Sequence, residues 1–216
     1  MVQLIVYPSV DGRVGYSGTE LTWADLLVAG GNSISQSGTS ELTIHISAGV
    51  TTNKWQTLIR GIFLFDTSAI SSSANISSAT LSLYGVYKRD DLLITPNINI
   101  YSSNPASNTI LVDADYGSLG STPFCDTPIT YNNWSEVGYN DFILNAAGIA
   151  AITKGGITKL GTRNASYDVA AVAPSWSQPS VPNSELYCYT VEKGGSYRPK
   201  LTINYTLAFI PQVIII

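Results

Sequence analysis

Residues 76–87, Ile-Ser-Ser-Ala-Thr-Leu-Ser-Leu-Tyr-Gly-Val-Tyr, alternate between apolar and polar side chains. Successive side chains of a β-strand point to opposite faces, so this alternation places Ala79, Leu81 and Leu83 together on one face. Hydroxyl groups dominate the other face. The stretch therefore predicts a half-buried strand of an antiparallel sheet.

A second stretch, residues 55–66, reads Trp-Gln-Thr-Leu-Ile-Arg-Gly-Ile-Phe-Leu-Phe-Asp and is apolar on both faces after Arg60. This pattern is typical of a central strand that is covered on both sides. The strand is expected to stop at Asp66-Thr67-Ser68, because these side chains can cap a turn.

Further short strands are predicted along the whole chain, joined by turns rich in Gly, Ser, Asn and Pro. Helical signals are confined to residues 22–29, with Thr22 as N-cap, and residues 145–154, which end before two glycines. We therefore predict an all-β, two-sheet antiparallel sandwich of eight to ten strands with two short crossover helices. One domain is expected over residues 1–206, followed by an apolar tail, residues 207–216. The additional strands are predicted at residues 4–7, 13–16, 42–46, 97–101, 141–144, 159–162, 166–169, 185–191 and 199–205.

The surface of this sandwich must be built mainly from uncharged polar groups. Charged residues make up only 12% of the chain, against about 25% in typical domains, whereas Ser, Thr and Asn account for 60 of its 216 residues. With a net charge of −4, the chain lacks the basic patch that nucleic acids or anionic membranes require. No apolar run is long enough to span a membrane, and the first residues do not form a secretory signal.

Catalytic and metal-binding signals are weak. His45 is the single histidine and is predicted to face solvent without a partner. Asp113 and Asp115 stand at alternate positions before a glycine, as in part of a calcium-binding loop. The other ligands of such a loop are missing, so an acidic loop without calcium fits the residues better. Cys125 and Cys188 are compatible with a disulfide or with two buried thiols, and their spacing does not fit a zinc site. We expect no enzyme activity, cofactor or metal.

Aromatic side chains are the stronger lead toward a binding function, since the chain has four Trp and thirteen Tyr. Tyr and Trp join a flat apolar face to a polar tip, which suits stacking on sugar rings and equally suits anchoring loops in a core. The candidates for glycan binding lie in turn-rich stretches. They are Tyr131, Trp134, Tyr139 and Trp176.

The C-terminal tail is the most unusual segment, because it continues in apolar residues after a natural last strand that ends near Tyr205. Such a tail needs a partner groove to avoid a large exposed apolar patch. It can fold back on its own sandwich or add as a strand to a neighbouring subunit. The predicted assembly interface consists of Phe209, Ile210, Val213, Ile214, Ile215 and Ile216.

Four stretches together resemble the DNRLRE-type β-sandwich domains. They are Arg60-Gly-Ile-Phe-Leu-Phe-Asp-Thr-Ser-Ala-Ile, Ile76-Ser-Ser-Ala-Thr-Leu-Ser-Leu-Tyr, Tyr139-Asn-Asp-Phe-Ile-Leu-Asn and Arg198-Pro-Lys-Leu-Thr-Ile-Asn-Tyr. The resemblance covers about residues 7–205 and implies a jelly-roll fold of the kind found in microbial surface proteins, some of which are classed as carbohydrate-binding. It is closest to free-standing versions in phage and metagenomic sequences.

These observations predict a non-enzymatic structural protein. We expect a phage virion surface component, such as a capsid decoration, head fibre or tail appendage, or a subunit of an extracellular filament. The expected partners are further copies of the chain or other virion or filament proteins, with no binding to nucleic acid or membrane. The alternative is a carbohydrate-binding module of an extracellular protein that uses the four aromatic candidates.

Overall fold

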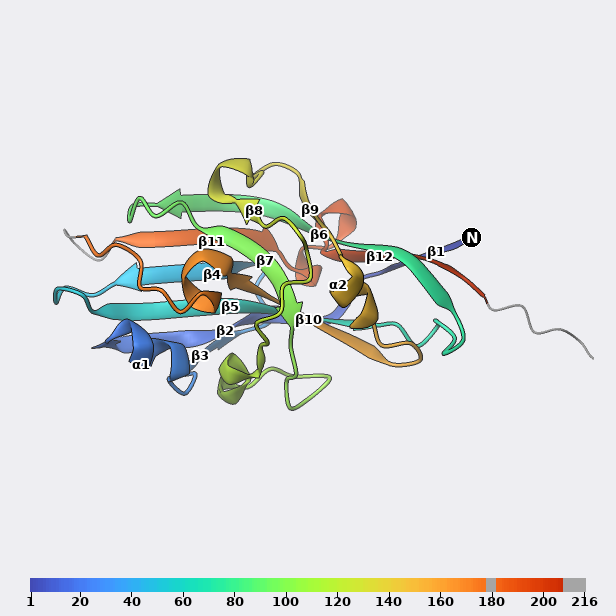
Figure 1. The fold of residues 1–216 in the computed structure, drawn as a ribbon, viewed down its shortest axis with the longest axis horizontal. Helices are drawn as coiled ribbons and strands as arrows, with labels where there is room; N and C mark the ends of the chain where they lie inside the picture. The colour runs from blue at the N-terminus through green and yellow to red at the C-terminus, as the bar shows by residue number, and fades with distance from the viewer. Residues whose placement is uncertain (178–181, 208–216) are drawn as a thin grey trace, which may run out of the picture.

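The computed structural model describes residues 1–177 and 182–207, and these residues form an antiparallel β-fold (Figure 1). There are two short α-helices: α1 (Trp23–Val28) packs against the outer face of the sheet, and α2 (Ala146–Ala150) packs against the core inside the curl. The strands in the described part of the chain are β1 (Val2–Val6), β2 (Pro8–Leu21), β3 (Ser33–Ser35), β4 (Ser40–Ala48), β5 (Trp55–Asp66), β6 (Asn75–Asp90), β7 (Asn97–Ser102), β8 (Ile129–Thr130), β9 (Tyr139–Ile143), β10 (Ile157–Asn164), β11 (Asn183–Tyr189) and β12 (Lys200–Thr206).

The strands are hydrogen-bonded in the order β1-β12-β6-β11-β4-β5-β10-β7-β8, and the sheet curls so that its two halves face each other. Strands β2 and β3 extend it beside β5, and β9 pairs with β6. The predicted all-β antiparallel sandwich is therefore confirmed, but the described residues form twelve strands instead of the predicted eight to ten. Its two layers are continuous, because the long strand β6 pairs with β12 through its first half and with β11 through its second half.

Two groups of buried apolar side chains stabilise the fold, and β5 separates them. The inner core lies inside the curl and includes Phe63 and Phe65 of β5, the apolar face of β6 and Trp134. The outer core lies on the other face of β5, where Ile62 and Leu64 pack with α1. The prediction that β5 is covered on both faces is thus confirmed. The two core clusters are built around these side chains: inner core, Ile44, Phe63, Phe65, Leu81, Leu83, Trp134, Leu186 and Leu201; outer core, Val14, Trp23, Leu26, Trp55, Leu58, Ile62, Leu64 and Tyr116.

The strand that pairs with one edge of β5 changes at Gly61, and we call this point the fork. Along this edge β5 pairs with β4 through Arg60 and with β10 from Gly61 onward, while β2 follows the opposite edge. At the fork, the hydroxyl of Thr162 accepts a hydrogen bond from Gly61 N at 3.0 Å and donates one to Thr43 O at 2.7 Å. A buried side chain thereby supplies the hydrogen bonds that the diverging backbones cannot make to each other.

The local predictions succeed where the pattern is long. Residues 55–66 form β5 within the predicted bounds, and Thr22 caps α1 by accepting a hydrogen bond from Asp25 N. The predicted strand at 166–169 is wrong, because this segment is a π-helical turn, η3 (Ala165–Val169). The Asn164 side chain accepts hydrogen bonds from the backbone N–H groups of Ser166 and Tyr167 and so begins the turn. No helix among the described residues is both long and apolar enough to cross a membrane.

Candidate functional site

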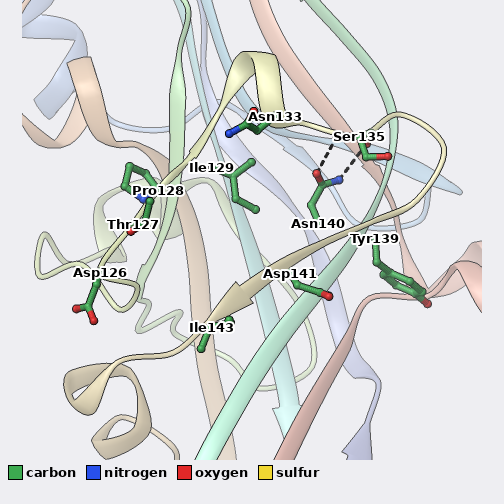
Figure 2. Close-up of a pocket in the computed structure, with 10 residues that line it drawn as sticks. All are labelled: Asp126, Thr127, Pro128, Ile129, Asn133, Ser135, Tyr139, Asn140, Asp141 and Ile143. Carbon is green, nitrogen blue, oxygen red and sulfur yellow. Dashed lines mark hydrogen bonds between the residues drawn. The ribbon is translucent and has the colours of Figure 1, made fainter.

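An open cleft lies between β9 and the loop that precedes it (Figure 2). Its volume is about 460 Å³, within the range of roughly 300–1,000 Å³ that is usual for ligand sites. Loop residues 126–135 form one wall, and β9 forms the other. Polar lining side chains are Asp126, Asn133 and Asp141, and apolar ones are Pro128, Ile129 and Ile143. This mixture suits a ligand with both apolar and hydrogen-bonding groups, such as an extended peptide.

The buried side chain of Asn140 holds the loop against the sheet. Its amide oxygen accepts a hydrogen bond from Ser135 N at 2.8 Å, and its amide nitrogen donates to Ser135 O at 3.0 Å and to Leu83 O at 3.3 Å. Gly85 of β6 permits this close approach, because a Cβ at that position would lie 1.9 Å from Ser135 O. The cleft therefore has a fixed wall.

Trp134 also holds the loop, and its position corrects one prediction. Its side chain is only 2% exposed and packs in the inner core, so it cannot present a sugar-stacking face to solvent. Lys88 reaches across from β6 and donates hydrogen bonds to Trp134 O at 3.0 Å and Tyr131 O at 3.1 Å. The half-buried Tyr131 ring lies 5.0 Å from the same ammonium group. Both aromatic residues serve as loop anchors, which was the other interpretation of the sequence.

Strand β9 is an edge strand whose outer side faces the cleft. Gly85 N donates to Gly138 O at 3.0 Å, and Leu144 N donates to Ala79 O at 2.9 Å, which sets the register with β6. Backbone groups of an antiparallel strand alternate in direction, so those of Tyr139, Asp141 and Ile143 point away from β6. Within the described residues, these groups have no backbone partner on the cleft side.

Tyr139 connects the cleft to a tyrosine cluster formed by Tyr84, Tyr139, Tyr189 and Tyr197. The ring of Tyr84 lies 5.2 Å from that of Tyr139 and 5.0 Å from that of Tyr197, in edge-to-face contacts. Lys200 lies 3.9 Å from the Tyr139 ring centre, a cation–π distance. This packing holds one end of β9 in place.

The Tyr139 hydroxyl is also fixed. Its single O–H lies within hydrogen-bond distance of two backbone oxygens, Ser196 O at 2.6 Å and Arg198 O at 3.0 Å. Burial raises the pKa of Tyr139 above its ordinary value, so the hydroxyl keeps its proton and remains a donor. Of the four aromatic candidates, Tyr139 is the one that lines the cleft. Trp176 is not brought to it, since it packs against the outer core and donates to Gly49 O at 3.3 Å.

The predicted assembly residues, Phe209, Ile210 and Val213 to Ile216, lie outside the described residues. The last described residue, Leu207, follows β12 directly and is 63% exposed. The structure thus describes the chain up to the first residue of the tail.

Asp115 has a structural role in the acidic loop that the sequence singled out. Its carboxylate is buried and accepts hydrogen bonds from Ala106 N at 2.9 Å and Val112 N at 2.8 Å. These bonds begin the 3₁₀ helix η1 (Asp113–Ser118), whereas the side chain of Asp113 is exposed. Among residues 1–177 and 182–207, His, Cys, Asp and Glu side chains do not gather in groups of three that could hold a metal ion.

His45 is largely covered by its neighbours, and the two cysteines are buried. The prediction that His45 faces solvent without a partner is wrong: its side chain is 14% exposed, and Nε2 lies 3.2 Å from the side-chain oxygen of Asn183. Burial lowers the pKa of His45 to about 4, so the ring is neutral at pH 7. Cys125 and Cys188 are free thiols in the inner core. Burial raises the pKa of Cys125 to about 12, which keeps this thiol unreactive.

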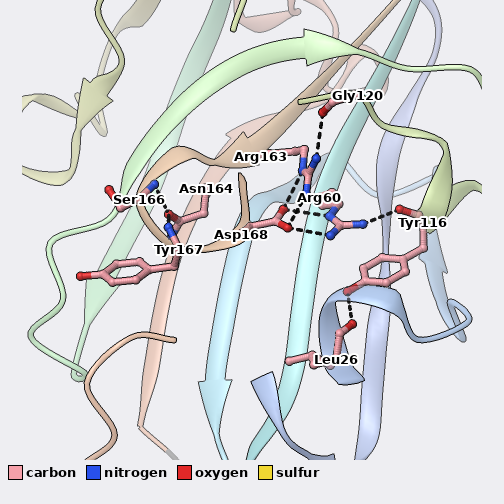
Figure 3. A network of polar contacts seen from close by, with 9 residues as sticks. All are labelled: Leu26, Arg60, Tyr116, Gly120, Arg163, Asn164, Ser166, Tyr167 and Asp168. Carbon is pink, nitrogen blue, oxygen red and sulfur yellow. Dashed lines mark hydrogen bonds and ion pairs between the residues drawn. The ribbon is translucent and has the colours of Figure 1, made fainter. Parts of the chain in front are cut away.

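A buried ion network connects β5 to β10, and the sequence did not predict it (Figure 3). The carboxylate of Asp168 accepts paired hydrogen bonds from Arg60, at 2.8 and 2.6 Å, and from Arg163, at 2.9 and 2.6 Å. Burial opposes ionisation, but the hydrogen bonds and charges of the two arginines outweigh it and hold the pKa of Asp168 below its ordinary value. The Arg60 guanidinium also lies 4.1 Å from the Tyr116 ring centre. The network fixes η3 on the sheet and contacts no cleft residue.

No family model and no curated protein matches the chain. The resemblance to DNRLRE-type domains therefore remains a prediction based on the strand and turn residues quoted above. The cleft and the open edge of β9 are therefore the features of the molecule that point to a function.

Proposed function

We propose that the protein is a non-enzymatic structural protein of a virion surface or an extracellular filament and that it assembles with further copies of itself. The observation that carries this proposal is the open edge of β9, whose outward backbone groups border a cleft. Unpaired strand edges readily accept another strand, and proteins that stay monomeric usually shield them. The apolar tail after Leu207 supplies a segment that needs such a partner.

The surface composition supports the same proposal. A coat of Ser, Thr and Asn with few charges favours contacts made through shape and backbone hydrogen bonds over charge-driven binding to nucleic acid or membrane. The two cleft carboxylates, Asp126 and Asp141, are both solvent-exposed. Acids that donate protons in enzymes usually lie in sites from which water is excluded, so these exposed carboxylates favour a non-enzymatic role.

Removing the tail tests the proposal. A chain truncated after Leu207 keeps β12 intact, because this strand ends at Thr206. We expect light scattering to give a multiple of the 23.1 kDa chain mass for the full-length protein and the mass of one chain after truncation. Circular dichroism controls for folding. A full-length protein that is already monomeric at all concentrations would refute the proposal.

Glycan binding in the same cleft is the second candidate, because Tyr139 lines the cleft together with the hydrogen-bonding side chains Asn133 and Asp141. Sugar sites commonly combine an aromatic face with such polar groups. On a glycan array, Asp141→Ala should then lose binding while Asp113→Ala, an exposed acid outside the cleft, keeps it. Equal signals from the two variants would exclude the cleft as a glycan site.

A further inference from the structure

We propose that the open edge of β9 is the acceptor for the tail, residues 207–216, of a second copy of the chain, which adds to β9 as an extended strand. This inference rests on the proposed function and specifies where the contact is made. Each copy would then carry one donor segment and one acceptor edge. Such a head-to-tail contact produces a ring or a filament, depending on the rotation between neighbouring copies.

The backbone of β9 provides the first argument. The backbone N–H and C=O groups of Tyr139, Asp141 and Ile143 point away from β6, toward the cleft. An added strand would satisfy these groups, and a five-residue edge is about 17 Å long. The ten residues of the tail span roughly 33 Å when extended. The tail is therefore long enough to cover the edge and to leave several residues as a connection.

The side chains around the cleft provide the second argument. Ile143 is 72% exposed at one end of β9, and Val137 is 84% exposed just before the other end. Pro128 and Ile129 on the facing wall add apolar surface. Residues 207–216 contain no charged side chain and are mainly apolar. A strand with this composition would cover the exposed aliphatic groups and would bring no charged side chain of its own into the cleft.

The other described strands that have a single partner fit the tail less well. Among the described strands, β3 and β8 also have one partner each, but they are only three and two residues long. The β1 edge is five residues long, yet no β1 residue lines the cleft. Strand β1 thus provides a matched control, with Ile5 exposed on an edge of the same length.

The first experiment changes the acceptor edge in the full-length protein. Ile143→Lys places a charge where the added strand would pack, and Asp141→Pro removes an outward N–H group while leaving the bonds to β6 intact. We expect both variants to have the mass of one chain by light scattering, whereas Ile5→Lys assembles like the parent. Circular dichroism checks folding, and Ile143→Lys keeps the test decisive if Asp141→Pro does not fold.

A second experiment asks whether the contact joins different copies. One chain carries Ile143→Cys and another carries Ile214→Cys, while the native cysteines remain buried. After mixing and mild oxidation, a disulfide-linked heterodimer is expected on a non-reducing gel. The control mixture pairs Ile5→Cys with Ile214→Cys and should give at least tenfold less of the cross-linked product.

The outcomes separate this inference from the proposed function. Loss of assembly on truncation, with full assembly of Ile143→Lys and Asp141→Pro, would overturn the β9 acceptor and leave self-assembly standing. A chain carrying both cysteine substitutions that cross-links only within itself would show that the tail covers its own β9, and would overturn assembly in trans. A monomeric parent protein would overturn both proposals.

Discussion

Asp11 of β2 is a buried carboxyl group with few partners. It accepts hydrogen bonds from Val191 N at 3.0 and 3.3 Å, and two acids, Glu192 and Glu41, lie close enough to disfavour its ionisation. Burial is the main reason that the pKa of Asp11 rises to about 8, from 3.8 for an exposed aspartate. The folded protein therefore holds a proton on Asp11 at neutral pH that the unfolded chain releases.

This proton makes stability fall as pH rises. Between about pH 4 and 8 the contribution of Asp11 to the free energy of unfolding declines by about 1.4 kcal/mol per pH unit. We expect Asp11→Asn to match the parent near pH 4 and to exceed its stability at pH 8, measured by urea unfolding across this range. Asp113→Asn, at an exposed site, should follow the parent curve. A constant difference between Asp11→Asn and the parent at every pH would contradict the prediction.

Two residues, Arg60 and Trp134, have contacts that the sequence alone could not predict. Arg60, a lone charge in an apolar strand, signals a buried carboxylate partner, since charges are rarely buried unpaired. Nothing local identifies Asp168 as that partner, because it lies 108 positions away. Trp134 was equally ambiguous, because whether a loop aromatic is exposed or buried depends on packing by distant strands such as β6.

Among the elements, the fork of β5 is the feature most sensitive to one hydroxyl. Thr162→Val keeps the shape of the side chain but leaves Gly61 N and Thr43 O without their buried partner. Each of these two unsatisfied groups costs roughly 1–3 kcal/mol, so we expect a loss of about 2–6 kcal/mol in urea denaturation. Thr162→Ser retains the hydroxyl and should recover most of this loss.

Thr202 of β12 is the matched control for the fork. It is half-buried in a regular strand, and its hydroxyl makes no hydrogen bond within the described residues. Thr202→Val should change the free energy of unfolding by no more than about 0.5 kcal/mol. Equal effects at positions 162 and 202 would mean that the fork hydroxyl contributes nothing specific.

Elements with long, regular patterns were predictable and irregular ones were not. The bounds of β5 follow directly from its apolar run, and β6 contains all of residues 76–87. Residues 166–169 imitate a strand, but side-chain capping and the Arg60–Asp168 contact impose the π-helical turn η3. The cleft could not be predicted for a related reason. Its wall is positioned by contacts of Asn140 and Gly85 with Ser135, and these contacts form only when β6, β9 and the loop come together in the folded protein.

For the whole molecule, the shared strand β5 predicts one cooperative unfolding transition. The inner core cannot open without releasing Phe63 and Phe65, and this displaces Ile62 and Leu64 of the outer core. Independent reporters exist for the two cores. In a Trp134→Phe variant, the remaining tryptophans all lie in or against the outer core, while both thiols lie in the inner core.

We expect tryptophan fluorescence and thiol labelling in that variant to give the same urea midpoint, coincident with circular dichroism. Far-ultraviolet circular dichroism reports the sheet as a whole and serves as the reference. Thiols that react at urea concentrations where fluorescence is still native would show that the cores unfold separately, and would contradict the shared-strand argument.

Strand β1 pairs with β12, from Val2 opposite Tyr205 to Val6 opposite Leu201, so the first and last strands of the sheet are neighbours. During synthesis, residues 2–6 leave the ribosome about 200 residues before their partner exists. The nascent sandwich must therefore stay open until Lys200–Thr206 emerges, with Leu4, Val6 and the inner core only partly covered. Strand pairing between such distant segments forms late and leaves apolar surface open to chaperones in the meantime. The pairing of β12 with β1 is therefore expected to be a late step in the folding of the nascent chain.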